Sequence, residues 1–247
     1  MQTLEASIYS WQIDAAAIFI RYFVMAGLAY FVFYVWKKEA FAARKLSASP
    51  IPKGQIIKEL AYSCSTLTIF CLLSWFIFKL YYLGYTRIYA GLNQHSWLYF
   101  FGSIVGMVLL HDVYFYWTHR LIHWKRLYKW VHQVHHQSVL PNPFSAFSFH
   151  PFEAILAAGI VPLIVFSFPV HPYALFIFLG YMTFINVMGH LGYEIFSQKF
   201  RRSILGKYQN TGTHHSMHHQ NAKVNFGLYF TFWDKWMKTE KIKEGKN

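Results

Sequence analysis

Three long apolar runs restrict the environment in which this chain can fold. They cover residues 15–36, 60–80 and 97–117 of the 247 residues. About 20 apolar residues in a helix cross the hydrocarbon core of a bilayer, and each run reaches that length. Hydrophobic side chains make up 55% of the chain and charged side chains only 13%. The sequence therefore predicts an all-α integral membrane protein.

Two shorter apolar runs follow at residues 153–170 and 172–189, separated by the sequence FPVHP. Each is a little short for a full crossing, so a tight hairpin and a tilted pair of helices both satisfy the pattern. Either geometry returns the chain to the side from which it came. We expect about four to five transmembrane or re-entrant helices in one bundle.

A single membrane domain over residues 1–247 accounts for this organisation. We expect spans and loops in residues 1–109, a catalytic region in residues 110–236 and a polar tail in residues 237–247. Residues 120–149 are charged and polar, and we predict an amphipathic helix on the cytoplasmic surface of the membrane there.

Basic residues indicate the orientation of the chain. Between residues 37 and 58 there are six lysines and arginines against one glutamate, and short loops rich in these residues stay in the cytoplasm. The formal net charge of +13 is explained by basic loops that contact anionic lipid, so no nucleic-acid partner is expected. We predict a bacterial inner-membrane protein with its functional site on the cytoplasmic side, and leave its oligomeric state open.

Histidines recur in tight groups near the ends of the apolar runs. His119 and His123 are four residues apart, and the motif H-x-x-H-H begins at His132 and again at His215. On an α-helix, residues at i, i+3 and i+4 share one face, so each group should aim its imidazoles at a common point, as a metal site requires. The candidate ligands are His119, His123, His132, His135, His136, His190, His214, His215, His218 and His219.

About nine imidazoles are too many for one metal ion and suit two, each with four or five nitrogen ligands. Neutral imidazole binds Zn, Cu, Fe and Ni, so the ligand type alone leaves the metal open. The context favours iron. A site below apolar helices would let a lipid chain reach an oxidising centre, and oxidation of an inert C–H bond requires a redox metal and O2.

Other polar residues occur inside the predicted spans. Asp112 precedes His119 by two helical turns, so its carboxylate is placed either to accept a hydrogen bond from a ligand imidazole or to form an interhelical salt bridge. His111 is expected to be structural. Arg21 would be costly in the middle of a span, so we expect it to face protein or to extend toward the membrane surface.

Taken together, these motifs resemble the fatty acid hydroxylase and sterol desaturase superfamily. The similarity covers residues 110–236 and consists of D-x-x-x-x-x-x-H-R-x-x-H from Asp112, H-x-x-H-H from His132, the segment from His190 to Glu194, and H-x-x-H-H from His215. The resemblance implies a helical membrane bundle capped by a cytosolic, histidine-rich dimetal site. It also implies an O2-dependent, non-haem diiron enzyme that hydroxylates or desaturates a membrane lipid.

The same resemblance implies cofactors and partners. Two Fe ions are expected, with Zn able to replace them in purified protein. The sequence contains no haem-binding segment of the cytochrome b5 type, so electrons are expected from a separate protein of cytochrome b5 or ferredoxin type and its reductase. Hydroxylation and desaturation both stay open, as do sterol-like, fatty acyl, sphingoid, ether-lipid and carotenoid substrates.

Further residues take roles from the resemblance. Asn186 stands where several relatives carry a histidine, and its amide is a candidate to hold metal weakly through a water. Glu194 is a candidate base or proton carrier, with an ion pair to Arg201 or Arg202 as the alternative. The sequence HPFE from His150 is expected to be structural, because it opens the first of the two shorter runs. The candidate catalytic residues are therefore Asp112, Asn186 and Glu194.

Two other classes of protein compete with an enzyme: a metal-transporting or metal-buffering membrane protein, and a non-catalytic lipid-binding relative. Transport requires polar ligands at mid-membrane depth, and the predicted spans hold few polar residues of that kind beyond Arg21, His111 and Asp112. The complete histidine groups argue against a degenerate site.

If the histidine groups bind metal, then His135→Ala and His218→Ala should each lower bound metal and abolish turnover. His95→Ala and His171→Ala should be near neutral, because both residues are expected in loops. Elemental analysis of each purified variant measures the first effect. Full activity in either of the first two variants, or loss of half the metal in either of the last two, would contradict the assignment.

Overall fold

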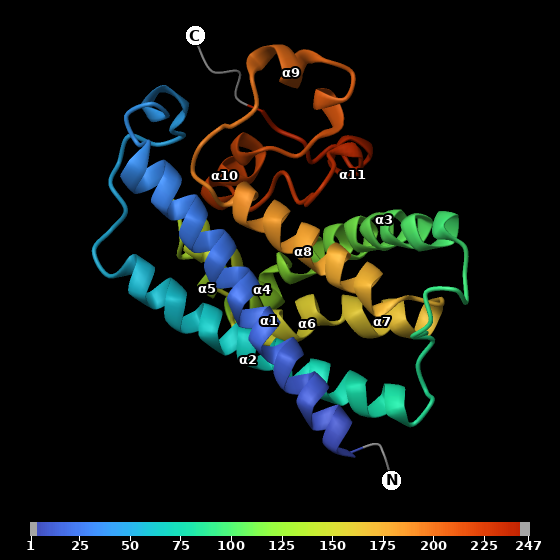
Figure 1. Ribbon diagram of the computed structural model, residues 1–247. Coiled ribbons are helices and arrows are strands. Elements are labelled where there is room, and N and C mark those ends of the chain that lie inside the picture. Colours follow the sequence, from blue (N-terminus) through green and yellow to red (C-terminus); the bar gives the residue numbers. More distant parts are fainter. Residues whose placement is uncertain (1–3, 243–247) are drawn as a thin grey trace.

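The computed structural model describes residues 4–242, and these residues form a bundle of helices with no β-strand (Figure 1). Four segments are long and apolar enough to cross a membrane: Trp11–Trp36, Gln55–Tyr82, Trp97–Ile122 and Pro172–Gly189. The first comprises most of α1 (Leu4–Tyr30) and a π-helical continuation, Phe31–Trp36, and the other three are α2, α3 and α8. The predicted all-α membrane bundle is confirmed. Residues 243–247 of the predicted polar tail lie outside the described residues.

The apolar run before α8 forms two short helices, α6 (Pro151–Ala158) and α7 (Ile160–Ser167). Gly159 joins them where α3 comes close, since a Cβ at this position would lie 2.5 Å from the Tyr114 hydroxyl oxygen. At the end of α7, the Arg87 N–H donates to the Val165 carbonyl. Helix α7 therefore ends beside the loop between α2 and α3. Together, α6, α7 and α8 form a helical hairpin that runs through the bundle.

The segment after α3 differs from the predicted amphipathic surface helix, and that prediction was wrong. Helix α3 continues to Ile122, and the chain then forms α4 (Lys125–Val131), α5 (Gln133–His136) and a 3-10 turn, Pro143–Phe147. Two prolines, at positions 141 and 143, prevent a longer helix because proline lacks the N–H that the helix needs. Much of this segment is buried among the spans instead of lying on their surface.

A buried carboxylate ties this segment to α2. The Glu59 side chain accepts hydrogen bonds from Gln55 Nε2, Ser138 Oγ and Asn142 Nδ2, each 2.7 Å long. Nearby, the fully buried Tyr22 of α1 donates to the Phe144 carbonyl oxygen at 2.7 Å. These contacts hold the loop that follows α5 against the first two spans.

The last fifth of the chain covers one end of the bundle with short helices, seen at the top of Figure 1 beside the end of α8. They are α9 (Gln198–Arg202), a 3-10 turn Gly206–Tyr208, α10 (Gly212–Gln220) and α11 (Phe232–Trp236). Helix α10 starts close to the chain that follows α8, since a Cβ on Gly212 would lie 2.6 Å from the Tyr193 carbonyl oxygen. Only glycine permits this approach, which brings α10 against the end of α8 (Figure 1).

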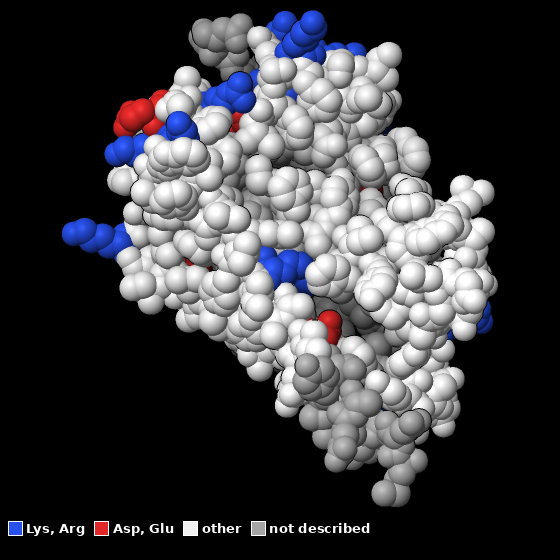
Figure 2. All heavy atoms as spheres, in the orientation of Figure 1, with Lys and Arg blue, Asp and Glu red and all other residues white. Residues whose placement is uncertain are grey.

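The outer surface matches a membrane environment. Large apolar side chains such as Leu98, Ile57 and Trp97 are exposed on the spans. Figure 2 shows a broad uncharged face, with most of its lysines and arginines gathered toward the end that carries the short helices. This distribution suits a bundle whose sides contact lipid and whose capped end contacts water.

Glu59→Ala should destabilise the protein by about 2–4 kcal/mol, because it leaves the buried donors of Ser138 and Asn142 without this acceptor. Thermal unfolding in detergent, followed by intrinsic fluorescence, measures the effect. The control is Lys53→Ala, which changes an exposed residue just before α2 and should change stability by less than about 0.5 kcal/mol. Equal unfolding temperatures for the two variants would show that the carboxylate does not hold the loop.

Candidate metal centre

Nine histidines converge at the capped end of the bundle in two neighbouring sets. They come from α3, the α4–α5 segment, the end of α8, and α10. The five-histidine set contains His119, His123, His132, His136 and His218, and the four-histidine set contains His135, His190, His215 and His219. In each set the candidate ligand atoms lie within 4.8 Å of one another.

The Nε2 atoms face one another within each set. In the five-histidine set, Nε2 of His119 lies 3.1 Å from that of His132, and Nε2 of His218 lies 3.1 Å from that of His136. In the four-histidine set, Nε2 of His190 lies 3.1 Å from that of His135 and 2.9 Å from that of His215. Two nitrogens bound at ~2.1 Å to one metal and at right angles to each other are ~3.0 Å apart, so these spacings fit a bound metal ion.

Each H-x-x-H-H motif contributes to both sets, which corrects the expectation that a motif aims at a common point. His132 and His136 belong to one set and His135 to the other. Residues at i and i+4 lie one turn apart on the same side of a helix, whereas the neighbour at i+3 points about 60° away from the first. The motif therefore spans two adjacent metal positions and does not surround one.

Contacts at Nδ1 orient the rings. The Nδ1 atoms of His119, His190 and His218 lie 2.9, 2.8 and 2.7 Å from the carbonyl oxygens of Phe226, Asn186 and Val224. A carbonyl oxygen can only accept, so Nδ1 must donate and the lone pair is left on Nε2, which points inward. Backbone geometry thus selects the tautomer that can bind metal.

Glu153 orients a further ligand, and the sequence analysis did not identify this role. Its Oε1 lies 2.7 Å from Nδ1 of His132, and both side chains are buried. A carboxylate in this place fixes the ring and makes it a stronger donor to metal. The HPFE sequence is structural in part, since His150 caps the start of α6. The sequence signal that could have indicated this role is an acidic residue at the start of an apolar run, where a charged side chain is costly unless it has a partner.

Burial keeps the imidazoles neutral. Removal from water lowers the pKa of His190 to about 4 and that of His136 to about 3, and it lowers the pKa of His215 and His219 well below the usual range. Neighbouring histidines add to the effect, because protonating one ring disfavours protonating the next. At neutral pH the rings therefore present lone pairs.

Two candidate catalytic residues make other contacts than expected. Asp112 Oδ1 accepts from the backbone N–H groups of Tyr229 and Phe230 at 3.2 Å. Within the described part of the chain it forms neither the bond to a ligand imidazole nor the salt bridge. The Asn186 amide donates to the Ala146 carbonyl oxygen at 3.0 Å. Its own backbone carbonyl, and not its side chain, contacts a predicted ligand, His190.

Glu194 caps α10 and does not take part in either histidine set. Its Oε2 accepts from the Thr213 N–H at 3.2 Å and from the Thr213 hydroxyl, and its Oε1 accepts from the Phe196 N–H at 3.0 Å. Of the described residues, neither Arg201 nor Arg202 forms the expected ion pair with it. The carboxylate satisfies free N–H groups at the helix start, so its effect on the ligands of α10 is indirect.

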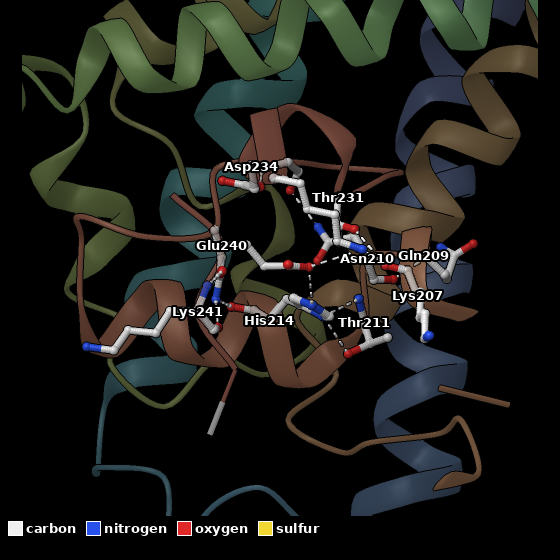
Figure 3. A network of polar contacts seen from close by, with 12 residues as sticks. Lys207, Gln209, Asn210, Thr211, His214, Thr231, Asp234, Glu240 and Lys241 are labelled. Atoms are coloured by element: carbon white, nitrogen blue, oxygen red, sulfur yellow. Dashed lines mark hydrogen bonds and ion pairs between the residues drawn. The ribbon is translucent and has the colours of Figure 1, made fainter. Parts of the chain in front are cut away.

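His214 also lies outside both sets, which corrects its assignment as a ligand. Figure 3 shows its ring beside Thr211 and Glu240. Its Nδ1 lies 3.0 Å from the Thr211 hydroxyl oxygen, and its Nε2 lies 3.8 Å from Glu240 Oε1. The ring turns back over the first turn of α10 to cap it, whereas His215, one position later, points about 100° away into the metal centre.

The remaining histidines lie elsewhere. His111 contacts the Tyr229 hydroxyl at 2.8 Å, as expected of a structural residue. His95 lies in the loop between α2 and α3, and His171 caps α8. None of the three is in a histidine set of the described chain.

An apolar cavity of about 220 Å3 leads from the spans toward the histidines. Its wall includes His111, Phe115, Phe149, Ala157 and Asn186, which also line a second, smaller cavity. The smaller cavity reaches histidines of both sets: His119, His132, His135, His190 and His215. The larger cavity between the spans is therefore separated from the histidines only by the side chains that both cavities share.

The chain matches the fatty acid hydroxylase family over residues 104–239, more than half of its length. It is 29% identical over 223 residues to lathosterol oxidase of Mus musculus, with 88% of this chain and 69% of the relative covered. It is 29% identical over 215 residues to a Delta(7)-sterol 5(6)-desaturase of Gibberella zeae, with 86% and 62% covered. A Delta(7)-sterol 5(6)-desaturase of Schizosaccharomyces pombe is 28% identical over 218 residues, with 87% and 61% covered. No solved structure matches the chain.

The chain belongs to the fatty acid hydroxylase family, so the resemblance seen in its motifs is confirmed. Its four apolar spans and its relatives make it an integral membrane oxidoreductase. The two buried histidine sets could hold metal at the capped end of the spans.

Glu153→Gln should weaken metal binding by about 10–100-fold, because the second contact of His132 is weakened while the ligands stay in place. Metal retention against a graded chelator series measures the loss. His95→Gln is the control: its ring lies in the loop between α2 and α3 and outside both sets, so metal retained per folded chain should match the unmodified protein. Wild-type retention by Glu153→Gln, or loss of a metal by His95→Gln, would contradict the structural assignment.

Proposed function

We propose that the protein is an O2-dependent, non-haem diiron enzyme that desaturates or hydroxylates a membrane lipid. The observation that carries this proposal is the meeting of two buried imidazole sets with an apolar cavity between the spans. The nine neutral nitrogen ligands, with no cysteine among them, fit iron. When bound, two iron ions would supply the activation of O2.

Both outcomes balance with an external supply of two electrons. In desaturation a CH–CH unit loses two hydrogen atoms, and O2 combines with these, two electrons and two protons to give two water molecules. In hydroxylation one oxygen atom enters a C–H bond, and the other leaves as water with two electrons and two protons. The choice depends on how the substrate carbon is placed.

The chain's own residues would hold the ligands and shape the access. Carbonyl acceptors and Glu153 keep the lone pairs of the rings directed inward. Phe115 and Phe149 lie between the two cavities and line both of them. Their rings exclude water and leave an apolar lipid as the preferred occupant.

We take a sterol-like lipid as the first candidate substrate, because the named relatives are a lathosterol oxidase and two sterol desaturases. Fatty acyl, sphingoid, ether-lipid and carotenoid substrates are further candidates that an apolar cavity of this kind would accept. The cavity wall is mainly apolar, and Asp14, Arg21 and Ser74 are among its few polar residues.

Electrons would come from a separate carrier of cytochrome b5 or ferredoxin type and its reductase. Lys125, Arg126 and Lys129 are exposed on α4, which connects the ligands His123 and His132. An acidic carrier that docks on this basic surface would stand close to the metals.

The cytoplasmic side of a bacterial inner membrane is the proposed location of the metal centre. The basic segment of residues 37–58 lies at the same end of the bundle, since the Leu46 N–H donates to the Gly192 carbonyl and the Glu194 N–H donates to the Arg44 carbonyl. Basic loops remain in the cytoplasm. Because the metal centre lies at the same end of the bundle as the basic segment, it would also be on the cytoplasmic side.

The test combines elemental analysis with O2 consumption by protein purified in detergent and reconstituted with Fe(II). We expect about two irons per chain and O2 uptake that is coupled to lipid oxidation when a reductant is present. A double variant, His135→Ala with His218→Ala, removes one ligand from each set and serves as the inactive control. Failure of iron to bind or to react would favour the metal-buffering or metal-transporting alternative.

A further inference from the structure

An arginine without a hydrogen bond lies inside the first span. Within the described residues Arg21 forms no hydrogen bond or close ion pair, its Nε is buried, and Asp14 is near enough to attract it electrostatically. The span covers Trp11–Trp36, so Arg21 is about 15 Å along the helix from the nearer end. That is beyond the reach of its side chain, so the guanidinium does not extend to the lipid headgroups. The side chain is partly buried and lines the apolar cavity.

The guanidinium lies on the wall of the apolar cavity together with two other polar groups. Asp14 precedes Arg21 by two turns on the same face of α1, and its Oδ2 accepts a hydrogen bond from the Ser74 hydroxyl of α2. All three residues line the cavity. A cation in apolar surroundings is costly unless an acceptor binds it. A hydrogen-bond acceptor for the Arg21 guanidinium is therefore expected from a molecule in the cavity.

The chemistry of this polar group selects its ligand. Arg21 can only donate hydrogen bonds, and the Asp14 carboxylate can only accept them. A hydroxyl does both and can bridge the two charges. A carboxylate would be repelled by Asp14, and an ether or ester oxygen would leave Asp14 unused. The neutral alcohol is therefore the best match.

The hydroxyl would be bound far from the metals. The end of α1 near the metal centre is marked by Tyr34, whose hydroxyl donates to the Leu191 carbonyl beside His190. Arg21 precedes Tyr34 by 13 residues, which is about 20 Å along the helix. The cavity wall continues from Arg21 past Phe149, whose ring lies 5.2 Å from that of His135.

We propose that Arg21 and Asp14 bind the hydroxyl group of a lipid alcohol and direct its apolar body toward the histidine sets. The carbons next to the hydroxyl then lie out of reach of the metals, and the oxidised carbon lies toward the other end of the molecule, which differs from the 5(6) position in the names of the relatives. The oxidation rests on the proposed function, but the binding of the alcohol does not, because it involves no turnover.

Binding of fluorescent lipids to the full-length, metal-loaded protein in detergent tests the proposal. The probes are a fluorescent sterol and a fluorescent long-chain primary alcohol, each compared with its O-methyl ether, and a fluorescent long-chain fatty acid. At least one alcohol should bind about tenfold or more tightly than its ether. Arg21→Met should abolish that difference and leave the metal content unchanged.

Matched variants separate binding from folding. Val24→Ala changes a half-exposed residue of the same span and should keep the preference for the alcohol. Asp14→Asn provides a second route if Arg21→Met does not fold, and it too should reduce the preference. The proposal is overturned if neither alcohol binds more tightly than its ether, if the fatty acid binds more tightly than the alcohols, or if Arg21→Met binds like the unmodified protein.

The same protein distinguishes this proposal from the proposed function. Preferential binding of the alcohol without any O2 consumption after iron reconstitution would support the Arg21 site and contradict the oxygenase. Oxidation of lipid by a protein that binds alcohol and ether equally would support the oxygenase and overturn the Arg21 site.

Discussion

The convergence of nine neutral imidazoles in a buried space is the constraint on which the rest of the structure depends. Nε2 atoms about 3 Å apart, each with a lone pair pointing inward, repel one another unless a cation lies between them. For four of them, His119, His132, His190 and His218, the protein gives Nδ1 an acceptor of its own. The backbone carbonyl groups of Phe226, Asn186 and Val224 and the Glu153 carboxylate serve this purpose. Folding of the loops around the site and orientation of the ligands are thus one event.

The supporting contacts explain why several polar residues are buried without touching a metal position. Glu194 and His214 both cap α10, and Asp112 accepts hydrogen bonds from the backbone just before α11. Helix α10 has only nine residues, too short to be stable alone. Caps at the start of α10 and the close approach at Gly212 compensate for its short length. They fix the position of its three candidate ligands, His215, His218 and His219, relative to the other histidines.

Histidine spacing in the sequence was enough to predict that the histidine groups gather in one place, because i and i+4 positions share a helical face whatever the tertiary structure. The division into two sets was not predictable in this way. Whether His135 joins the set of His132 or the set of His190 depends on where the end of α8 lies. His135 and His190 are 55 residues apart in sequence. The same reason hid Glu153, whose contact with His132 forms only when α6 packs beside α5.

The sequence by itself determined the membrane spans, the helical class and the presence of a histidine centre, because hydrophobic length and helical periodicity are local properties. Tertiary structure alone decided which imidazole belongs to which set, which carboxylate orients a ligand and which one caps a helix. It also placed Arg21 against a cavity. These are contacts between segments distant in the chain, and their geometry depends on packing that no local pattern encodes.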